Sequence, residues 1–398
     1  MKLAPEVMLQ LPEMKAWRHH IHAHPETAFE EQHTSAFVAE RLAAMGLEVH
    51  TGIAKTGVVG VLRASGDRGD VPAIGLRADL DALHIEERTG AAHASQVRGK
   101  MHACGHDGHT TMLLGAAAAL KRRQKLAGTV YFIFQPAEEN EGGGRVMVEE
   151  GLFDRFPMRA VYGMHNWPRL PLGKMAMREG ALMGAYDVFE IVATGKGAHA
   201  AMPNEGKDPM LFAAHAINAL QTIVARNLHP LDAGVVSVTQ VHGGDTWNVI
   251  PEEVVLRGTV RSFKSAVQDL MEARMRTIVN GAAAMFDMSA TVHYERRYPA
   301  TVNSPRETQH AISAAGLVVG PDNVDTNPMP NMGSEDFAFM LQHRPGCYVW
   351  LGTGSGDDCP GLHSPHFDFN DEALAIGASY WVALAEEQLA QQSVRRVA

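Results

Sequence analysis

Short apolar runs alternate with helical patterns along the first part of the chain. Runs rich in small and β-branched residues predict four strands, at residues 57–64, 71–80, 129–135 and 160–165. The third run is apolar almost throughout, as in strands of a sheet that helices cover on both faces. Helices are predicted at 35–45, which stops at Gly46, and at the Ala-rich stretch 110–123. This alternation predicts an α/β fold with a mostly parallel sheet flanked by helices.

The order of elements changes in the middle of the chain. The pattern there predicts a strand, a long helix, two strands, a helix and a last strand, at residues 186–194, 208–227, 235–242, 254–263, 266–286 and 289–296. This β-α-β-β-α-β order is that of the ferredoxin-like α+β motif. We therefore expect a self-contained domain at residues 183–297.

The first pattern returns after this insert. A helix is predicted at 307–316, a strand at 347–352 and a C-terminal helix from Asp371. With 398 residues, the chain is also too long for one ordinary core. We expect a discontinuous main domain, residues 1–182 and 298–398, into which the ferredoxin-like domain is inserted.

Composition and charge narrow the class of protein. A content of 45% hydrophobic and 20% charged residues fits a folded globular chain. The formal net charge of −10 argues against a nucleic-acid partner, because such binding needs clustered Lys and Arg. Three cysteines (Cys104, Cys347 and Cys359) are too few for a disulfide framework and suit a reducing cytoplasm. No signal peptide and no run of 18 apolar residues occurs, so we expect a cytoplasmic protein without a membrane span.

A candidate metal-binding segment reads HACGHDGH at residues 102–109. The thiolate of Cys104 and the imidazole of His106 suit zinc and similar divalent metals. The glycine between them lets the backbone bend, so that both side chains can reach one point. The same residues also fit a loop before a helix in which histidines serve as caps.

An acidic segment, QPAEENEGGG, follows the apolar strand at 129–135 directly. Loops at the carboxyl ends of strands are the usual site of ligand binding in open α/β sheets. Adjacent carboxylates point in different directions, so one of Glu138 and Glu139 can bind metal while the other faces a substrate as a base. A solvated acidic loop is the alternative.

Two more histidines follow predicted strands, His165 in GMHNWP and His363 in LHSPH. Together the four segments supply five N, O and S ligands, and two divalent ions about 3.5–4 Å apart can clamp a hydroxide between them. Asp79 also ends a strand and can orient a histidine ligand, or cap a turn. The histidines at 19–24 lie on a predicted helix and are interpreted as structural. The glycine-rich loops at 195–203 and at 243–251 look like ordinary hairpin loops from their residues alone.

The motifs taken together resemble a known family. MHACGHDGH, QPAEEN, MHNWP, GAHAAMP, WNVIP, MGSEDF and LHSPHFDFND, in this order, are similar to the aminoacylase and hippurate hydrolase branch of the two-metal carboxypeptidase family. The resemblance runs from about His22 to the C-terminal helix. Each short motif is common, but their combination is specific to this family.

The resemblance implies a role for each site residue of the main, di-metal catalytic domain. Cys104 would bridge two divalent metal ions, and these ions could be zinc, manganese, cobalt or nickel. The ligand set would be completed by His106, Glu139, His165 and His363. Glu138 would be the general base, and Asp79 would support the site from behind the ligands.

The resemblance also assigns roles to the inserted domain. It would be a lid that forms a homodimer, or a tetramer. His199 would reach the active site of the partner subunit and stabilise the oxyanion, and Asn248 would contact the substrate. Gly333 and Ser334 would line the substrate pocket, and Arg261 would help to bind a carboxylate.

The expected activity is metal-dependent hydrolysis of the amide bond of N-acyl (aryl- or alkanoyl-) L-amino acids. A dipeptidase or carboxypeptidase of the same family and a non-catalytic metal-binding relative are the alternatives. A hydrolase with Cys104 as nucleophile would leave the other ligands unused. His84 stands where the family commonly has proline, which affects the shape of the turn near Asp79.

Overall fold

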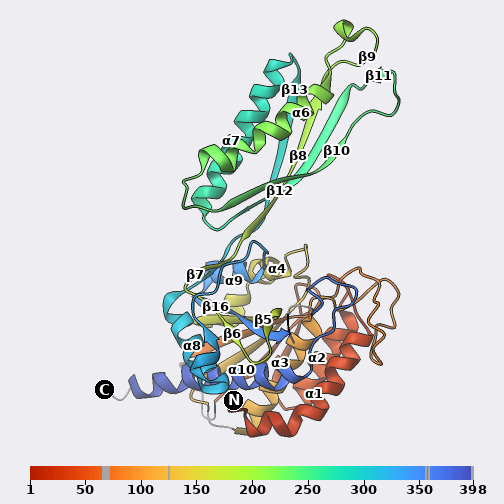
Figure 1. Cartoon of the computed structure of the whole chain (residues 1–398). Helices are drawn as coiled ribbons and strands as arrows, with labels where there is room; N and C mark the ends of the chain where they lie inside the picture. Colours follow the sequence, from red (N-terminus) through yellow and green to blue (C-terminus); the bar gives the residue numbers. More distant parts are fainter. Residues whose placement is uncertain (65–71, 124–125, 355, 357–358, 396–398) are drawn as a thin grey trace. The chain divides into compact units, whose positions relative to one another are not determined.

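A computed structural model describes the chain in two compact units, each considered by itself (Figure 1). The described residues are 1–64, 72–123, 126–354, 356 and 359–395. The first unit comprises Met1–Leu182, Val302–Met329 and Asp336–Ala398. The second unit comprises Met183–Thr301 and Pro330–Glu335. Two short strands, β7 (Gly180–Met183) and β14 (Thr301–Asn303), contain the first two of the four points at which the chain passes from one unit to the other.

The first unit is built on an eight-stranded sheet in the order β1-β2-β4-β3-β5-β16-β6-β15. Its strands are β1 (Glu48–Ile53), β2 (Gly57–Leu62), β3 (Ala73–Asp79), β4 (Thr129–Gln135), β5 (Ala160–Pro171), β6 (Met175–Ala176), β15 (Val324–Asp325) and β16 (Gly346–Gly354). The four central strands β4, β3, β5 and β16 are parallel to one another, whereas β1 and β2 run antiparallel at one edge. The predicted α/β fold with a mostly parallel sheet is confirmed.

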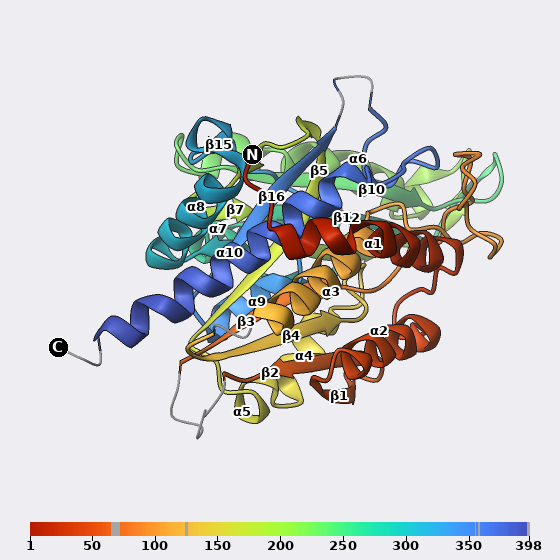
Figure 2. The same ribbon diagram turned by 90° about the horizontal axis from the view of Figure 1, so that it is seen from below.

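Helices cover both faces of this sheet. They are α1 (Pro5–Ala23), α2 (Gln32–Ala44), α3 (His106–Arg123), α4 (Gly143–Glu149), α5 (Leu152–Arg155), α8 (Pro305–Val319), α9 (Phe337–His343) and α10 (Glu372–Arg395). Gly377 of α10 packs against Met112 of α3 and Met164 of β5, whereas the neighbouring Gly163 faces α9 on the opposite side. Figure 2 shows α1, α3 and α10 side by side on one face. No helix in the described part of the chain is long and apolar enough to cross a membrane.

Several elements differ from their predicted extent. The strand β1 was not predicted, because only its last residue, Ile53, is buried and the rest of its sequence is polar or half exposed. The helix predicted at 110–123 starts earlier, at His106, so that a candidate ligand forms its first turn. The first residue of the strand predicted at 71–80, Val71, lies outside the described residues.

The second unit is a four-stranded antiparallel sheet with two helices on one face. Its elements are β8 (Ala185–Thr194), β9 (Ala198–His199), α6 (Pro209–Leu220), β10 (Gly234–His242), β11 (Val249–Ile250), β12 (Glu253–Ser262), α7 (Ser265–Met285) and β13 (Ser289–Tyr298). The sheet order β10-β12-β8-β13 is that of the ferredoxin-like motif, which confirms the predicted motif. Phe212 of α6, Leu256 of β12 and Met271 of α7 are fully buried in its core.

One predicted helix of this unit is interrupted. The sequence predicted a single helix at 208–227, but α6 ends at Leu220 and a π-helical turn follows at Ile223–Asn227. The β-branched run Thr222–Val224 explains the break, because such side chains lose rotamer freedom in a helix.

Candidate metal centre

The five expected ligands lie at one edge of the sheet in the first unit. Glu139 follows β4, His165 lies within β5, and His363 follows β16. Cys104 and His106 lie in the loop and first turn of α3, the helix that leads into β4. Because β4, β3, β5 and β16 are adjacent and parallel, their carboxyl ends bring these segments together.

The ligand atoms form two groups that share one thiol. Cys104, His106 and His165 offer ligand atoms within 4.8 Å of one another, and so do Cys104, Glu139 and His363. The Cys104 Sγ atom lies 3.4 Å from His165 Nε2. His363 Nε2 lies 3.1 Å from Glu139 Oε1. A sulfur atom common to two groups of ligands is the arrangement that a bridging cysteine requires.

The turn between Cys104 and His106 needs glycine. Gly105 has φ +93°, and a Cβ atom added there would lie 2.3 Å from Asn166 Oδ1. The neighbouring Ala103 carbonyl accepts a hydrogen bond of 2.8 Å from the amide of His363. Backbone contacts thus join the segments that carry three of the ligands.

Two candidate ligand histidines are oriented by backbone carbonyls. His106 Nδ1 lies 2.8 Å from the Asp81 carbonyl oxygen, and His165 Nδ1 lies 2.7 Å from the Asn166 carbonyl oxygen. An N–H at each Nδ1 leaves the Nε2 lone pair available for a metal ion. His106 Nε2 is buried and has no hydrogen-bond partner among the described residues, as expected of an atom that binds a cation.

The charges around these atoms favour a cation. Burial, together with the charges of Glu139 and Glu138, raises the pKa of the Cys104 thiol well above its usual range. A thiolate at this place therefore requires a positive charge beside it. Burial lowers the pKa of His106, but the carboxylates of Asp79 and Asp81 outweigh this effect and raise it to about 10. The donor set and its negative surroundings fit divalent metal ions.

Asp79 and its neighbour Asp81 support the site in different ways. Asp79 Oδ1 lies 2.6 Å from His109 Nδ1, and Asp79 Oδ2 lies 3.7 Å from His106 Nε2. Asp81 Oδ2 accepts a hydrogen bond of 2.9 Å from the amide of Glu139. Only Asp79 was predicted from the sequence to support the site, although Asp81 lies just two positions further along.

Glu138 is buried beside the candidate ligands and forms a third group with His106 and Glu139. The amide of Asp336 lies 3.4 Å from Glu138 Oε1. The carboxylate of Asp336 accepts hydrogen bonds from Arg77 (2.9 Å) and from the amide of Gly144 (2.7 Å). Asp336 was not predicted as a site residue, although the MGSEDF motif that contains it is a local sequence signal for it.

A buried charge network lies behind α3. His22 Nδ1 of α1 lies 2.8 Å from Asp107 Oδ2, and Arg18 Nη1 lies 3.5 Å from the same oxygen. Asp107 directly follows His106 in the sequence. The histidine-rich helix therefore contacts the helix that carries a candidate ligand, a contact that no local sequence signal indicated.

The other expected site residues belong to the second unit. His199 pairs with Val249 between β9 and β11, and the Asn248 carbonyl accepts a hydrogen bond of 2.9 Å from the amide of Ala200. Of these two candidate substrate contacts, His199 therefore lies in β9 and Asn248 directly precedes the paired strand β11. Arg261 Nη1 lies 3.3 Å from Ser334 Oγ. The amide of the adjacent Gly333 donates a hydrogen bond to an asparagine in the same segment.

Comparison with known proteins identifies the family. The model of peptidase family M20/M25/M40 matches residues 75–387. The chain is 40% identical to an N-acetyl-L-cysteine deacetylase of Bacillus subtilis, over 94% of this chain and 87% of the relative. It is 38% identical to the hippurate hydrolase of Campylobacter jejuni, over 98% of this chain and all of the relative.

A solved structure agrees with these matches. The Bacillus subtilis YXEP protein, described as a dinuclear metal binding peptidase of the M20 family, has a TM-score of 0.83 and 35% identity, and the match covers 96% of this chain and 99% of that one. The resemblance to aminoacylases and hippurate hydrolases is therefore confirmed, and with it the enzyme class, a metal-dependent amidohydrolase. The chain belongs to peptidase family M20/M25/M40.

Proposed function

We propose that the protein hydrolyses the amide bond of N-acyl L-amino acids with the help of two divalent metal ions. The observation that carries this proposal is the pair of ligand groups that share Cys104, with Glu138 buried beside them. The names of the relatives, a deacetylase of N-acetyl-L-cysteine and a hippurate hydrolase, support a small N-acyl amino acid as substrate.

The five ligands would hold the ions, and Glu138 would move the proton. Two bound divalent ions would polarise the amide carbonyl and lower the pKa of a water molecule. Glu138 takes the proton of that water and later delivers it to the leaving amine. The amide of Asp336, 3.4 Å from Glu138 Oε1, favours one orientation of the base. Zinc, manganese, cobalt and nickel all suit the ligand set.

The second unit would act as a lid that supplies substrate contacts. His199 Nδ1 accepts a hydrogen bond of 3.1 Å from the amide of Ala201. The neutral ring then carries its proton on Nε2, a donor suited to an oxyanion. Arg261 is held over the ring of Tyr186, 4.0 Å from its centroid, and suits the substrate carboxylate, with Ser334 beside it.

The same unit would form a homodimer. Helix α6 has no charged residue in its sequence PMLFAAHAINAL, and it exposes Met210 and Leu211. Strand β10 forms an open edge of the four-stranded sheet. An uncharged helix face and an open strand edge suit a two-fold interface between identical chains.

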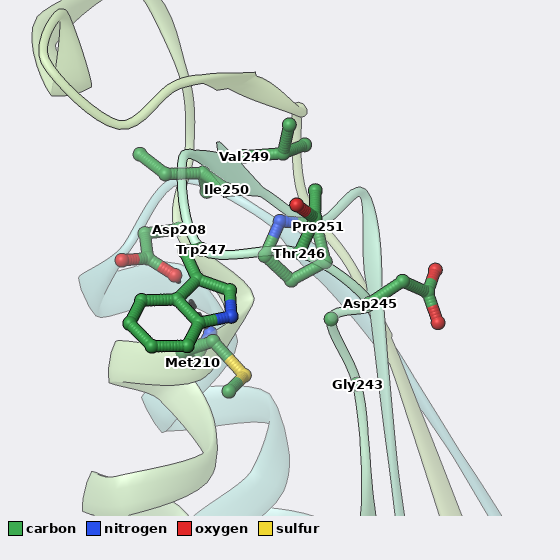
Figure 3. A pocket seen from close by; sticks show the side chains of 10 residues that line it. Asp208, Met210, Gly243, Asp245, Thr246, Trp247, Val249, Ile250 and Pro251 are labelled. Atoms are coloured by element: carbon green, nitrogen blue, oxygen red, sulfur yellow. Dashed lines mark hydrogen bonds between the residues drawn. The ribbon is translucent and has the colours of Figure 1, made fainter.

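The tip of this unit adds an apolar surface. Figure 3 shows Trp247 beside Met210 at a hollow of about 430 Å³, and the side chain of Trp247 is fully exposed. Trp247 directly precedes Asn248, a proposed substrate contact. An exposed tryptophan next to such a residue supports the proposal that this tip meets another surface in the working enzyme.

A release assay after metal reconstitution tests the proposed reaction. The protein is stripped with chelator, reloaded with zinc or manganese, and offered N-acetyl amino acids, benzoyl-glycine and dipeptides. Metal-dependent release of free amine from the acyl amino acids supports the proposal. Release from dipeptides alone reassigns the protein as a dipeptidase. A protein that binds metal but releases no amine from any of these compounds contradicts the proposed activity.

A further inference from the structure

Two buried carboxyl groups hold the backbone on either side of the proposed base. The amide of Ala137, just before Glu138, donates a hydrogen bond of 2.9 Å to Glu31 Oε1. The amide of Glu139, just after it, donates one of 2.9 Å to Asp81 Oδ2. Glu31 is 0% exposed and Asp81 is 1% exposed. The base therefore projects from a short stretch of backbone that is fixed at both ends.

Ala137 needs such support because of its backbone conformation. Its φ is +53°, in the left-handed region that residues with a Cβ atom rarely adopt. Its carbonyl accepts a hydrogen bond of 2.9 Å from the amide of Gly143, which closes the turn. The turn is tight, since a Cβ atom at Gly143 would lie 1.8 Å from the Pro136 carbonyl oxygen. Strained residues of this kind persist only where the surrounding structure holds them.

Glu31 supports the backbone of Ala137 from a different part of the chain, the segment just before α2. It precedes α2 directly, and its second oxygen, Oε2, accepts a hydrogen bond of 2.6 Å from Thr56 Oγ1. One buried carboxyl group thus joins the start of α2, the turn between β1 and β2, and the loop after β4.

We propose that Glu31 is a positioning residue for the proposed general base, and this inference rests on the function proposed above. Its carboxyl group holds the amide of Ala137, and thereby the left-handed turn from which Glu138 projects. The carboxyl oxygens of Glu31 accept hydrogen bonds from the amide of Ala137 and from Thr56 Oγ1, so Glu31 acts through the backbone of the loop.

Glutamine is a matched replacement for this residue. Burial and the nearby charge of Asp81 raise the pKa of Glu31 to about 7, so a neutral side chain suits this position. An amide oxygen can accept the bond from Ala137, and the amide nitrogen can donate to Thr56 Oγ1. Alanine keeps neither contact. The three variants E31Q, E31A and T56V therefore separate the two hydrogen bonds.

The test uses the metal-loaded full chain and its three variants. Amide hydrogen exchange of the peptide that contains Ala137 is measured together with kcat, KM and bound metal. In E31A we expect exchange in this peptide to be about tenfold faster. We expect kcat of E31A to fall about 10- to 100-fold, with KM and metal content little changed, because a small misplacement of a catalytic group costs rate more than binding. E31Q and T56V are expected to stay within roughly threefold of the parent protein.

Two results would overturn the proposal. One is a folded E31A whose loop exchanges at the parent rate, and the other is a folded E31Q that loses as much activity as E31A. If E31A does not fold, the test depends on E31Q alone. A fall in kcat of about tenfold or more in folded E31Q contradicts the positioning role of Glu31. Hydrogen exchange does not depend on the substrate, so it tests Glu31 even if the parent protein hydrolyses no acyl amino acid.

Discussion

At the residue scale, the proposed chemistry depends on one buried carboxylate that is not among the five candidate metal ligands. Glu138 lies beside His106 and Glu139, yet its neighbour Glu139 is the residue that faces Cys104 and His363. The adjacent glutamates share His106 as a neighbour, but only Glu139 also lies beside Cys104 and His363, which suits a division between base and ligand.

The variant E138Q tests this division. Glutamine keeps an acceptor for the amide of Asp336 but cannot take a proton, so we expect kcat to fall by about 10²- to 10⁴-fold at unchanged metal content. Steady-state kinetics and elemental analysis of the purified protein measure both. E141Q is the control, because Glu141 lies in the same loop but is exposed. Near-normal turnover of E138Q would remove Glu138 from the mechanism.

His22 gives the protein a pH-dependent contribution to stability. Burial and the charge of Arg18 lower its pKa, but the carboxylates of Asp107 and Glu87 outweigh them and raise it from 6.5 to about 9. A pKa that is higher in the folded than in the unfolded state stabilises the fold. The stabilisation is complete at pH values below the pKa of the unfolded state, and it is lost as the pH rises through the pKa of the folded state.

We therefore expect the free energy of unfolding of the parent protein to fall as the pH rises from about 6.5 to about 9. This fall should exceed the fall in H22Q by on the order of 2–3 kcal/mol. Denaturant unfolding at several pH values measures the difference. H24Q is the control, since His24 is exposed at the end of the same helix. Parallel pH curves for the parent and H22Q would show that His22 is not charged in the folded state.

The candidate ligand residues could be predicted from the sequence, but the residues that hold their loops in place could not. Cys104 and His363 belong to short motifs with ligand chemistry, and parallel strands bring such motifs together. Glu31 and Asp81 act through hydrogen bonds to backbone amides far away in the chain, and an acidic residue has no local pattern that reveals such a bond. Tertiary contacts alone assign them a place in the site.

At the element scale, the loop before α3 is the most constrained part of the site. Replacing Gly105 by alanine would place a Cβ atom 2.3 Å from Asn166 Oδ1, in a backbone conformation that disfavours alanine. We expect G105A to lose most of its bound metal and about 100-fold or more in kcat, because Cys104 and His106 flank this residue.

Elemental analysis and kinetics check this expectation, with G361A as the control. A Cβ atom at Gly361 meets nothing within 4 Å, and this glycine lies in the same loop as His363. Full metal content in G105A would indicate that the loop adapts and that Cys104 needs no glycine beside it.

Element boundaries follow local sequence where the core imposes a clear pattern. Strand β4 has the bounds that its apolar run predicted, and each of its residues is buried. Strand β1 escaped prediction because it is an edge strand whose pairing with β2, not its own hydrophobicity, makes it a strand. The early end of α6 likewise reflects β-branched residues that helical periodicity does not register.

At the scale of the whole molecule, the proposed dimer rests on the outer face of α6. Leu211 is 51% exposed there and has no charged neighbour on its own helix. We expect L211E to convert a dimer into a monomer, because burying a carboxylate in an apolar interface is costly. Light scattering coupled to size exclusion measures the mass. L317E, at a similarly exposed leucine of α8, should leave the mass unchanged. A parent protein that is monomeric at all concentrations would refute the dimer.

The path of the second unit has a consequence for the history of the gene. Tyr186, near the start of β8, pairs with Tyr298 at the end of β13, so the inserted chain returns to the place where it began. A segment whose two ends lie side by side can be inserted or exchanged as one unit without displacing the strands of the domain that contains it. All five candidate ligands are encoded outside residues 183–301. Under the proposed role of this unit as a lid, recombination changes the substrate contacts while the coding sequence of the candidate metal ligands stays intact.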